Sequence, residues 1–354
     1  MTEWRPTYLR ELMTIKNGKD HKALHDGDYP VYGSGGIMRY VDKYLYDKES
    51  VLLPRKGTLN NIQYANTPFW TVDTCYYTEV NTEKVLPYFL YNCLRQYDIE
   101  ALNTGSAIPS MTFEKYYSIQ INLPNLETQR RIADVLSRYD ALIENYQRQI
   151  KLLEEAAQRL YKEWFVDLRF PGHQSTPIIN NLPQSWQKKS VNDILTFHRG
   201  YDLTKDSFKN GKYPVVGSTS ILGYHCNYKI DGPGIVTGRS GSLGVYQLIW
   251  ENFWPHNTSL YVSDFKGHDI FFIYCLLKTL DFTTLNSGGA IPSLNRNTLS
   301  NIQVLEPSMD LQDAFSRIVK PMFVKQRNLS IQIRNLSEAR DRLLPKLMNA
   351  EIDV

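Results

Sequence analysis

The stretch NLETQRRIADVLSRYDALIENYQRQIKLLEEAAQRLYKEWF (Asn125–Phe165) decides how the chain is organised. Its apolar and small side chains recur at alternating steps of four and three residues, the heptad pattern of a helix that packs against another helix. These positions are Ile132, Leu136, Tyr139, Ile143, Tyr146, Ile150, Leu153, Ala157, Leu160 and Trp164. Pro124 stops a helix from extending upstream, and Asn125 is a favourable N-cap. The pattern predicts a long helix over residues 125–170 whose apolar stripe requires a partner.

A second version of this stretch begins at Ser308 and reads SMDLQDAFSRIVKPMFVKQRNLSIQIRNLSEARDRLLPKLM. Counting 183 residues on from each stripe position of the first stretch finds an apolar residue at eight of ten places. These are Phe315, Val319, Met322, Leu329, Ile333, Leu336, Leu343 and Leu347. Gln326 and Arg340 interrupt the stripe, and Pro321 is expected to kink the helix. Two such helices in one chain, over 125–170 and 308–349, most simply pack on each other.

The repeat extends over nearly the whole chain. YPVYGS at Tyr29–Ser34 recurs as YPVVGS at Tyr213–Ser218, and LNTGSAIPS at Leu102–Ser110 recurs as LNSGGAIPS at Leu285–Ser293. Short β-prone segments between glycine, proline and asparagine turns, with one helix per half, predict two homologous mixed α+β domains. The expected order is a first domain over 1–124, a helix over 125–170, a linker over 171–185, a second domain over 186–307, a helix over 308–349 and a tail over 350–354.

The composition of the chain narrows its class of fold, its partners and its location. The chain has 354 residues, of which 42% are hydrophobic, enough to build two cores. Its net charge of +3 is too small to indicate nucleic-acid binding by itself. With no apolar run of membrane length and no charged-then-apolar N-terminus, we expect a cytoplasmic protein. The four cysteines show no CxxC spacing and are expected to be buried thiols. They are Cys75, Cys93, Cys226 and Cys275.

Sequence motifs for catalysis are missing. The chain contains no GxxxxGK[ST], no HExxH, no GxGxxG at a strand end and no Asn-Pro-Pro-aromatic sequence of an amino-methyltransferase. GRSGSLG at Gly238–Gly244 lacks the lysine and the strand-to-helix context of a phosphate-binding loop. The seven histidines show no metal-ligand spacing. The sequence therefore predicts no catalytic residue and no metal site.

The segments YPVYGS, LLPRKG and LNTGSAIPSM, the second copy of this set and the final EARDRLLPKLM are specific in combination. The chain resembles, over essentially its full length, the specificity subunit of type I restriction–modification enzymes. The resemblance implies two target-recognition domains, each reading one half of a split DNA site, separated by an antiparallel coiled coil. It also implies two methyltransferase subunits and restriction/translocase subunits as partners. S-adenosylmethionine, ATP and Mg²⁺ are then expected on those partners, and this chain supplies recognition without catalysis.

A pair of long helices suits such a role. Two DNA readers on a rigid support must meet the duplex in a fixed rotational phase, and half-sites about one turn apart, roughly 34 Å, lie on one face. A helix of about 40 residues is roughly 60 Å long, which is of the right order. Two other interpretations remain open at this point: a stand-alone DNA-modifying enzyme, and a coiled-coil adaptor that binds no DNA.

Candidates for base contacts are polar residues of expected exposed loops. In the first half they are Arg39, Tyr40, Arg55, Lys56, Asn60, Asn61 and Gln63, and in the second half His225, Arg239, Ser240 and Asn257. Arginine and asparagine can form paired hydrogen bonds with guanine and adenine in the major groove. Arg55 and Arg239 could instead bind phosphate or stay solvated. The SAIPS segment, Ser106–Ser110, is nearly identical in both halves and is therefore expected to be architectural or to contact the DNA backbone.

Overall fold

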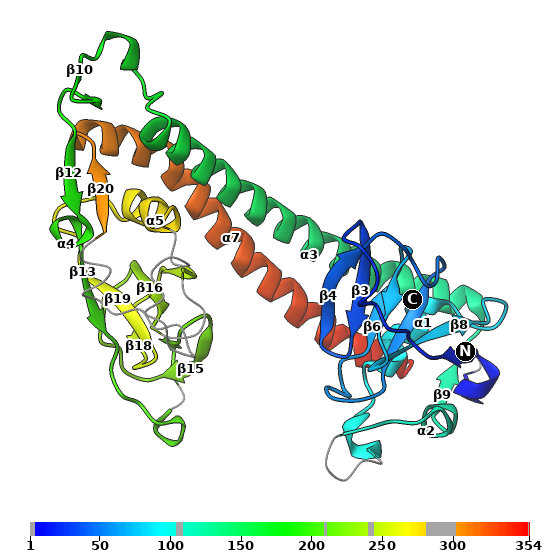
Figure 1. The fold of residues 1–354 in the computed structure, drawn as a ribbon. Helices are drawn as coiled ribbons and strands as arrows, with labels where there is room; N and C mark the ends of the chain where they lie inside the picture. The colour runs from blue at the N-terminus through cyan, green and yellow to red at the C-terminus, as the bar shows by residue number, and fades with distance from the viewer. Residues whose placement is uncertain (1–3, 104–108, 209–210, 240–243, 281–301, 353) are drawn as a thin grey trace. The chain divides into compact units, whose positions relative to one another are not determined.

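The computed structural model describes residues 4–103, 109–208, 211–239, 244–280, 302–352 and 354. The chain forms two compact units, Met1–Glu144 with Ile333–Val354 (unit 1) and Asn145–Gln332 (unit 2). Each unit holds one mixed α+β domain together with one end of helix α3 (Leu126–Tyr161) and one end of helix α7 (Met309–Met348) (Figure 1). The predicted fold class is confirmed.

The first domain has two larger sheets and a small one. Its elements are β1 (Arg5–Tyr8), η1 (Leu9–Glu11), β2 (Met13–Lys16), β3 (Tyr29–Gly33), β4 (Gly36–Val41), β5 (Ser50–Pro54), β6 (Gln63–Ala65), β7 (Trp70–Thr71), β8 (Cys75–Val80), α1 (Pro87–Leu94), η2 (Glu100–Leu102), α2 (Phe113–Tyr117) and β9 (Gln120–Leu123). The strand orders are β2-β8-β5-β6, β4-β3-β7 and β1-β9. β3 and β7 pair in parallel, whereas β5 pairs antiparallel with both neighbours. All five residues of β5 are buried, as expected for an apolar central strand covered on both faces.

The second domain repeats this topology. Its elements are β12 (Gln187–Ser190), α4 (Val191–Ile194), β13 (Thr196–Arg199), η5 (Lys205–Ser207), β14 (Tyr213–Val216), β15 (Ile221–His225), β16 (Gly234–Gly238), β17 (Tyr246–Ile249), β18 (Trp254–Pro255), β19 (Ser259–Asp264), α5 (Ile270–Lys278) and β20 (Gln303–Glu306). The strand orders β13-β19-β16-β17, β15-β14-β18 and β12-β20 match those of the first domain one for one. The internal repeat in the sequence is therefore a repeat of structure.

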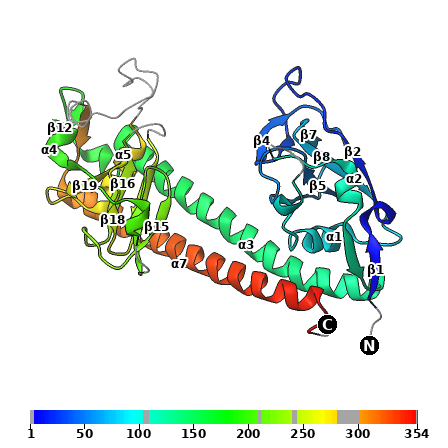
Figure 2. The ribbon, with the colours of Figure 1, turned by 90° about the horizontal axis from the view of Figure 1, so that it is seen from below.

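In unit 1 the long helices join the core of the first domain. Helix α1 lies between the strands of this domain and α3 (Figure 2). Phe89 of α1 is fully buried in one cluster with Ile132 and Leu136 of α3 and Leu347 of α7. The start of α3 thus meets the end of α7, so the two helices are antiparallel in this unit.

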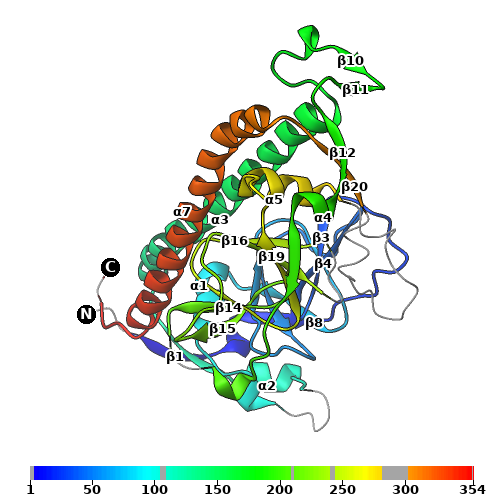
Figure 3. The same ribbon diagram turned by 90° about the vertical axis from the view of Figure 1, so that its left-hand side faces the viewer.

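Unit 2 has an aromatic core. Helix α5 lies against the ends of α3 and α7 that belong to this unit (Figure 3). The Phe315 ring of α7 lies 5.9 Å from Trp164, 5.2 Å from Phe165 and 6.5 Å from Phe272 of α5, measured between ring centroids. Here the end of α3 meets the start of α7, again antiparallel.

The seam positions are buried or half-buried in both helices, as the heptad pattern predicted. The Asn125 side chain accepts the Thr128 N–H at 2.9 Å and caps α3 as expected. The α-helix ends at Tyr161 and continues as a π-helical turn, η3 (Lys162–Val166), short of the expected residue 170. Helix α7 passes through Pro321 without interruption.

Gln326 and Arg340, expected to interrupt the stripe, have polar partners on α3. In unit 1, Arg340 Nη1 donates to Asp140 Oδ1 at 2.6 Å. In unit 2, the Gln326 amide, oriented with its nitrogen toward the carboxylate, reaches Glu154 at 3.2 Å. These residues form polar layers, which specify register in helix pairs.

Two other expectations need correction. Cys75, Cys93 and Cys275 are buried thiols as predicted, and burial raises the pKa of Cys75 to about 12, but Cys226 is exposed because it follows the end of edge strand β15. The expected linker also contains regular structure: η4 (His173–Ser175) and a hairpin of β10 (Ile178–Ile179) and β11 (Leu182–Pro183). Positive φ angles at Asn180 and Asn181 suit the two-residue turn of such a hairpin.

Candidate nucleic-acid interface

In unit 1, three loops meet beside the turn between β3 and β4. We define the first loop cluster as residues 33–36, 55–63, 73–74 and 109–110. The Asn61 side chain donates to Ser34 O at 2.8 Å, and the Gln63 amide donates to Gly33 O at 2.8 Å. The backbone N–H of Gly57 donates to Pro109 O at 3.1 Å. These bonds hold the loop after β5 between the glycine turn and the Pro109 segment.

Gly57 allows this close packing. Its φ of +90° is a conformation that favours glycine, and a Cβ there would lie 3.0 Å from Ser34 Oγ. The Arg55 N–H and the Lys56 N–H donate to Thr74 O at 2.8 and 3.3 Å, so the backbone that leads into Gly57 is also fixed. The loop can therefore present its side chains at defined positions.

Unit 2 contains an equivalent arrangement. We define the second loop cluster as residues 217–218, 239 and 257–258, next to positions 240–243, which lie outside the described residues. Arg239 N–H donates to Thr258 O at 3.1 Å, and the Gln247 amide donates to Gly217 O at 3.0 Å. Each bond joins positions 184 residues after Arg55–Thr74 and Gln63–Gly33 in unit 1. Two hydrogen bonds of the frame thus recur in unit 2, whereas the Asn61–Ser34 bond does not, because the equivalent position 245 is a valine.

The side chains on this frame differ between the units. At the same offset, Lys56 corresponds to Ser240 and Asn61 to Val245, while Asp73 corresponds to Asn257. A partly shared frame with different side chains is the arrangement expected of two readers with different targets.

Arg55 is the best-placed cation of the first loop cluster. Its side chain is half-buried, with Nη1 3.4 Å from Asp73 O and the guanidinium carbon 5.9 Å from the centre of the Tyr76 ring. Burial raises the pKa of Tyr76, and the Arg55 charge opposes that rise. Lys56 beside it is exposed and pairs through its backbone with Ser110. The structure thus brings together Arg55, Lys56, Asn61 and Gln63.

Other candidates lie elsewhere than expected. Arg39 and Tyr40 are in strand β4, not in a loop, and Arg39 Nη2 binds Asp26 at 2.8 Å and Leu24 O at 3.1 Å. Tyr40 is 50% exposed on this strand. Asn60 lies within the first loop cluster, but its side chain turns toward Asp98, at 3.2 Å. These residues do not share the contacts that hold the Gly57 loop.

His225 was expected to be exposed, and this is wrong. It ends strand β15 with only 6% of its surface accessible, because its ring packs 5.3 Å from Trp254. Its Nδ1 accepts the Asn227 N–H at 2.9 Å, which satisfies the buried nitrogen. In the second loop cluster, Arg239 is half-buried, the Asn257 amide donates to Asp202, and Ser240 lies outside the described residues.

Sequence reasoning missed Gln247, the counterpart of Gln63. The signal was available, because both glutamines and both acceptor glycines share the 184-residue offset. The repeated bond indicates an architectural role for the Gln63 amide nitrogen. The SAIPS segments, by contrast, are largely outside the described residues.

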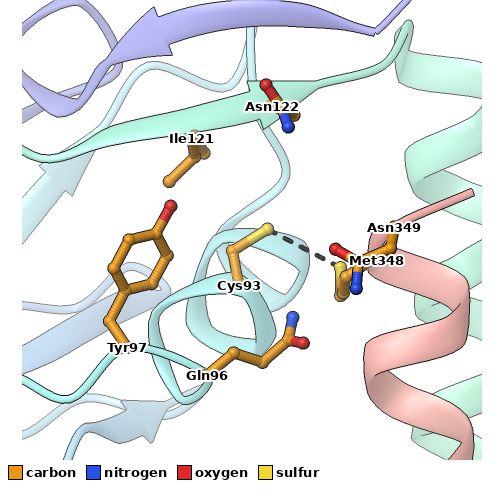
Figure 4. A pocket seen from close by; sticks show the side chains of 7 residues that line it. All are labelled: Cys93, Gln96, Tyr97, Ile121, Asn122, Met348 and Asn349. Carbon is orange, nitrogen blue, oxygen red and sulfur yellow. Dashed lines mark hydrogen bonds between the residues drawn. The ribbon is translucent and has the colours of Figure 1, made fainter.

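A cavity of about 310 Å³ in unit 1 lies apart from the loop cluster (Figure 4). Its lining combines α1, β9 and the end of α7, and Cys93 Sγ approaches Met348 Sδ to 3.6 Å. The lining residues are Cys93, Gln96, Tyr97, Ile121, Asn122, Met348 and Asn349. None of them belongs to the first loop cluster.

Within the described ranges, no three His, Cys, Asp or Glu side chains are grouped so that they could hold a metal ion. The same part of the chain has no helix that is both long and apolar enough to span a membrane.

Comparisons with protein families, with known sequences and with solved structures all match type I specificity subunits. Residues 1–155 and 183–335 match the family described as type I restriction modification DNA specificity domain. The type I restriction enzyme MjaIX specificity subunit of Methanocaldococcus jannaschii is 26% identical, covering 94% of this chain and 86% of that protein. The HindI specificity subunit of Haemophilus influenzae is 24% identical, covering 77% of this chain and 79% of the relative. The crystal structure of an S subunit from M. genitalium shares the fold, with a TM-score of 0.63 at 20% identity over 98% of this chain and 96% of that one.

Proposed function

Because the chain belongs to the family of type I restriction–modification DNA specificity subunits, we propose that it reads a split, asymmetric DNA site. Each domain binds one half-site, and the paired helices set the spacer between the half-sites. The observation that carries this proposal is the repeated loop frame with different side chains in the two units. Identical readers would carry the same side chains and recognise a symmetric site.

The proposed mechanism of reading uses the geometry of each loop cluster. The hydrogen bonds of Asn61, Gln63 and Gly57 fix the backbone before DNA arrives, so little conformational entropy is lost on binding. Arg55 and Lys56 then face the duplex, where a guanidinium can contact guanine and an ammonium can neutralise phosphate. Arg239 plays the corresponding part in unit 2.

The chain is proposed to act without catalysis of its own, as the scaffold of a larger complex. It holds two methyltransferase subunits, and restriction/translocase subunits join them. S-adenosylmethionine, ATP and Mg²⁺ belong to those partners in this proposal. The two-fold repeat of domain and helix supports two equivalent partner sites, because equivalent surfaces bind equivalent subunits.

The proposal is tested with purified components. The chain alone is expected to transfer no methyl group to DNA, whereas the chain with its methyltransferase subunits is expected to methylate one split site. Incorporation of labelled methyl groups into genomic fragments is the measurement, and methyltransferase subunits without the chain are the control. Methyl transfer by the isolated chain at the rate of the complex would contradict the non-catalytic role.

Arg55→Ala and Arg239→Ala are each expected to weaken one half-site and leave the other unchanged. Their matched positions in separate units motivate this expectation, and a lost paired contact to guanine costs about 1–3 kcal/mol. The measurement is binding of the complex to duplexes with single substitutions in either half-site. Arg138→Ala, which removes an exposed cation paired with Asp134 on α3, is the control. Equal weakening on all sequences, with a shallower salt dependence, would instead identify a phosphate contact.

A further inference from the structure

A polar network joins the first domain to both long helices within unit 1. Tyr88 of α1 donates its hydroxyl to Asp140 Oδ2 at 2.5 Å. Arg340 of α7 donates Nη1 to the other oxygen of the same carboxylate at 2.6 Å. One carboxylate of α3 therefore binds the domain on one side and the partner helix on the other.

The centre of the network is partly shielded from solvent, and the network extends to Asp341, whose side chain is 55% exposed. The Arg340 side chain is 15% exposed and that of Asp140 31%. Arg340 Nη2 lies 2.9 Å from Asp341, and Arg95 at the end of α1 lies 3.9 Å from the same carboxylate and 5.4 Å from the Tyr91 ring. Burial raises the pKa of Tyr88, and its hydrogen bond to Asp140 raises it further. Hydrogen bonds between charged groups at low exposure are strong and directional.

Unit 2 has apolar residues at the equivalent positions, and its polar contacts lie at another layer, where Glu154 of α3 binds Lys278 of α5 and Gln326 of α7. At the 183-residue offset, Tyr88 corresponds to Phe271, Asp140 to Phe323 and Arg340 to Ala157. The Phe271 and Phe323 rings stack with centroids 5.4 Å apart and planes 13° apart, and Ala157 is fully buried. The two units therefore place their polar contacts between domain and helices at different positions. The hydrogen bonds of the network in unit 1 are directional, so they restrict the orientation of the first domain as well as attaching it.

We propose that Tyr88, Asp140 and Arg340 are positioning residues that fix the angle of the first domain on the helices of its unit, and thereby set which spacer lengths the complex accepts. This inference rests on the proposed function. Each base pair added to a spacer moves a half-site by about 3.4 Å and rotates it by about 35°. A domain held at one angle does not bind half-sites that are displaced in this way, whereas a domain whose orientation can vary does bind them.

The test measures methylation by the assembled complex on duplexes that share both half-sites and differ in spacer length one base pair at a time. Asp140→Asn and Tyr88→Phe remove the charge or the hydroxyl with little change in shape. Each variant is expected to lower the ratio of methylation at the preferred spacer to that at its neighbours by about tenfold, equivalent to ~1.4 kcal/mol. Base preference within each half-site is expected to be unchanged.

Two further variants separate positioning from stability. Tyr88→Phe/Asp140→Phe/Arg340→Ala gives unit 1 the side chains found at the equivalent positions of unit 2, and it is expected to fold yet to broaden the spacer profile. Arg138→Gln, which removes an exposed ion pair on α3, is expected to leave the profile unchanged. An unchanged spacer ratio in Asp140→Asn, or an equal loss of methylation at every spacer, would overturn the positioning role while leaving the proposed function intact. If the wild-type complex shows no spacer preference, the proposed function fails, and this inference fails with it.

Discussion

Replacing Phe315 with alanine is expected to lower the free energy of unfolding of unit 2 by about 3–5 kcal/mol, the range for a large aromatic removed from a packed core. The side chain is fully buried, and four aromatic rings surround it. Their centroids lie 5.2–6.5 Å away, in Tyr161, Trp164, Phe165 and Phe272. The ring lies where α3, α7 and α5 meet, so no single element can close the cavity by moving alone.

Denaturation with urea, followed by tryptophan fluorescence, measures this loss, because Trp164 belongs to the same cluster. Ile318→Ala is the matched control on the same helix, since that side chain is 44% exposed. A surface change of this kind is expected to shift the free energy of unfolding by about 0.5 kcal/mol or less. A loss below about 1 kcal/mol for Phe315→Ala would contradict the packing described for unit 2.

The long helices and the domain repeat could be predicted because their signals are local. The heptad spacing placed Ile132, Leu136, Ala157 and Trp164 on one stripe, and the structure buries all four. The strands followed from short apolar segments between turns, as in β5 and β16. Repetition of both patterns at a nearly constant offset then predicted two similar domains.

The polar layers of the helix pair could not be predicted in the same way. Gln326 and Arg340 look like defects when α7 is considered alone, because their partners belong to α3. Asp140 faces Arg340 and Glu154 faces Gln326 only once the antiparallel register is fixed. That register depends on contacts between residues far apart in the sequence, such as Asp140 and Arg340, which are 200 positions apart.

The loop residues were predicted least well, for a related reason. His225 and Arg39 are polar residues near glycine turns, which suggested exposed loops. The pairing of β14 with β15 and of β3 with β4 instead places them in strands, where packing against Trp254 buries one and Asp26 binds the other. Arg55 and Lys56 do lie beside the turn that Gly57 marks, where Lys56 is exposed and Arg55 is half-buried.

Adding one heptad to each long helix is expected to abolish methylation at the native spacer while preserving both half-sites. Duplicating Ile143–Gln149 in α3, with a matching heptad in α7, adds about 10 Å and keeps the seam in phase. Since about 10 Å is roughly three base pairs of duplex, the preferred spacer is expected to lengthen by about that amount. A heptad in α3 alone is the control, because it leaves apolar seam residues without partners.

An insertion of three matched heptads is the second arm of this design. It adds about 31 Å, close to the 34 Å of one helical turn of DNA. The second half-site then returns to nearly its original face of the duplex. We therefore expect this chain to recover more activity than the single insertion, at a spacer about nine or ten base pairs longer.

Methylome sequencing of cells that carry the methyltransferase subunits tests whether this chain chooses the half-sites and its helices set the spacer. Three strains are compared: one without this chain, one with the native chain and one with the chain lengthened in both helices. We expect no split motif in the first, one asymmetric split motif in the second, and the same two half-sites with a longer spacer in the third. A methylation pattern that does not change when the chain is removed, or a spacer that stays the same when both helices are lengthened, would contradict these expectations.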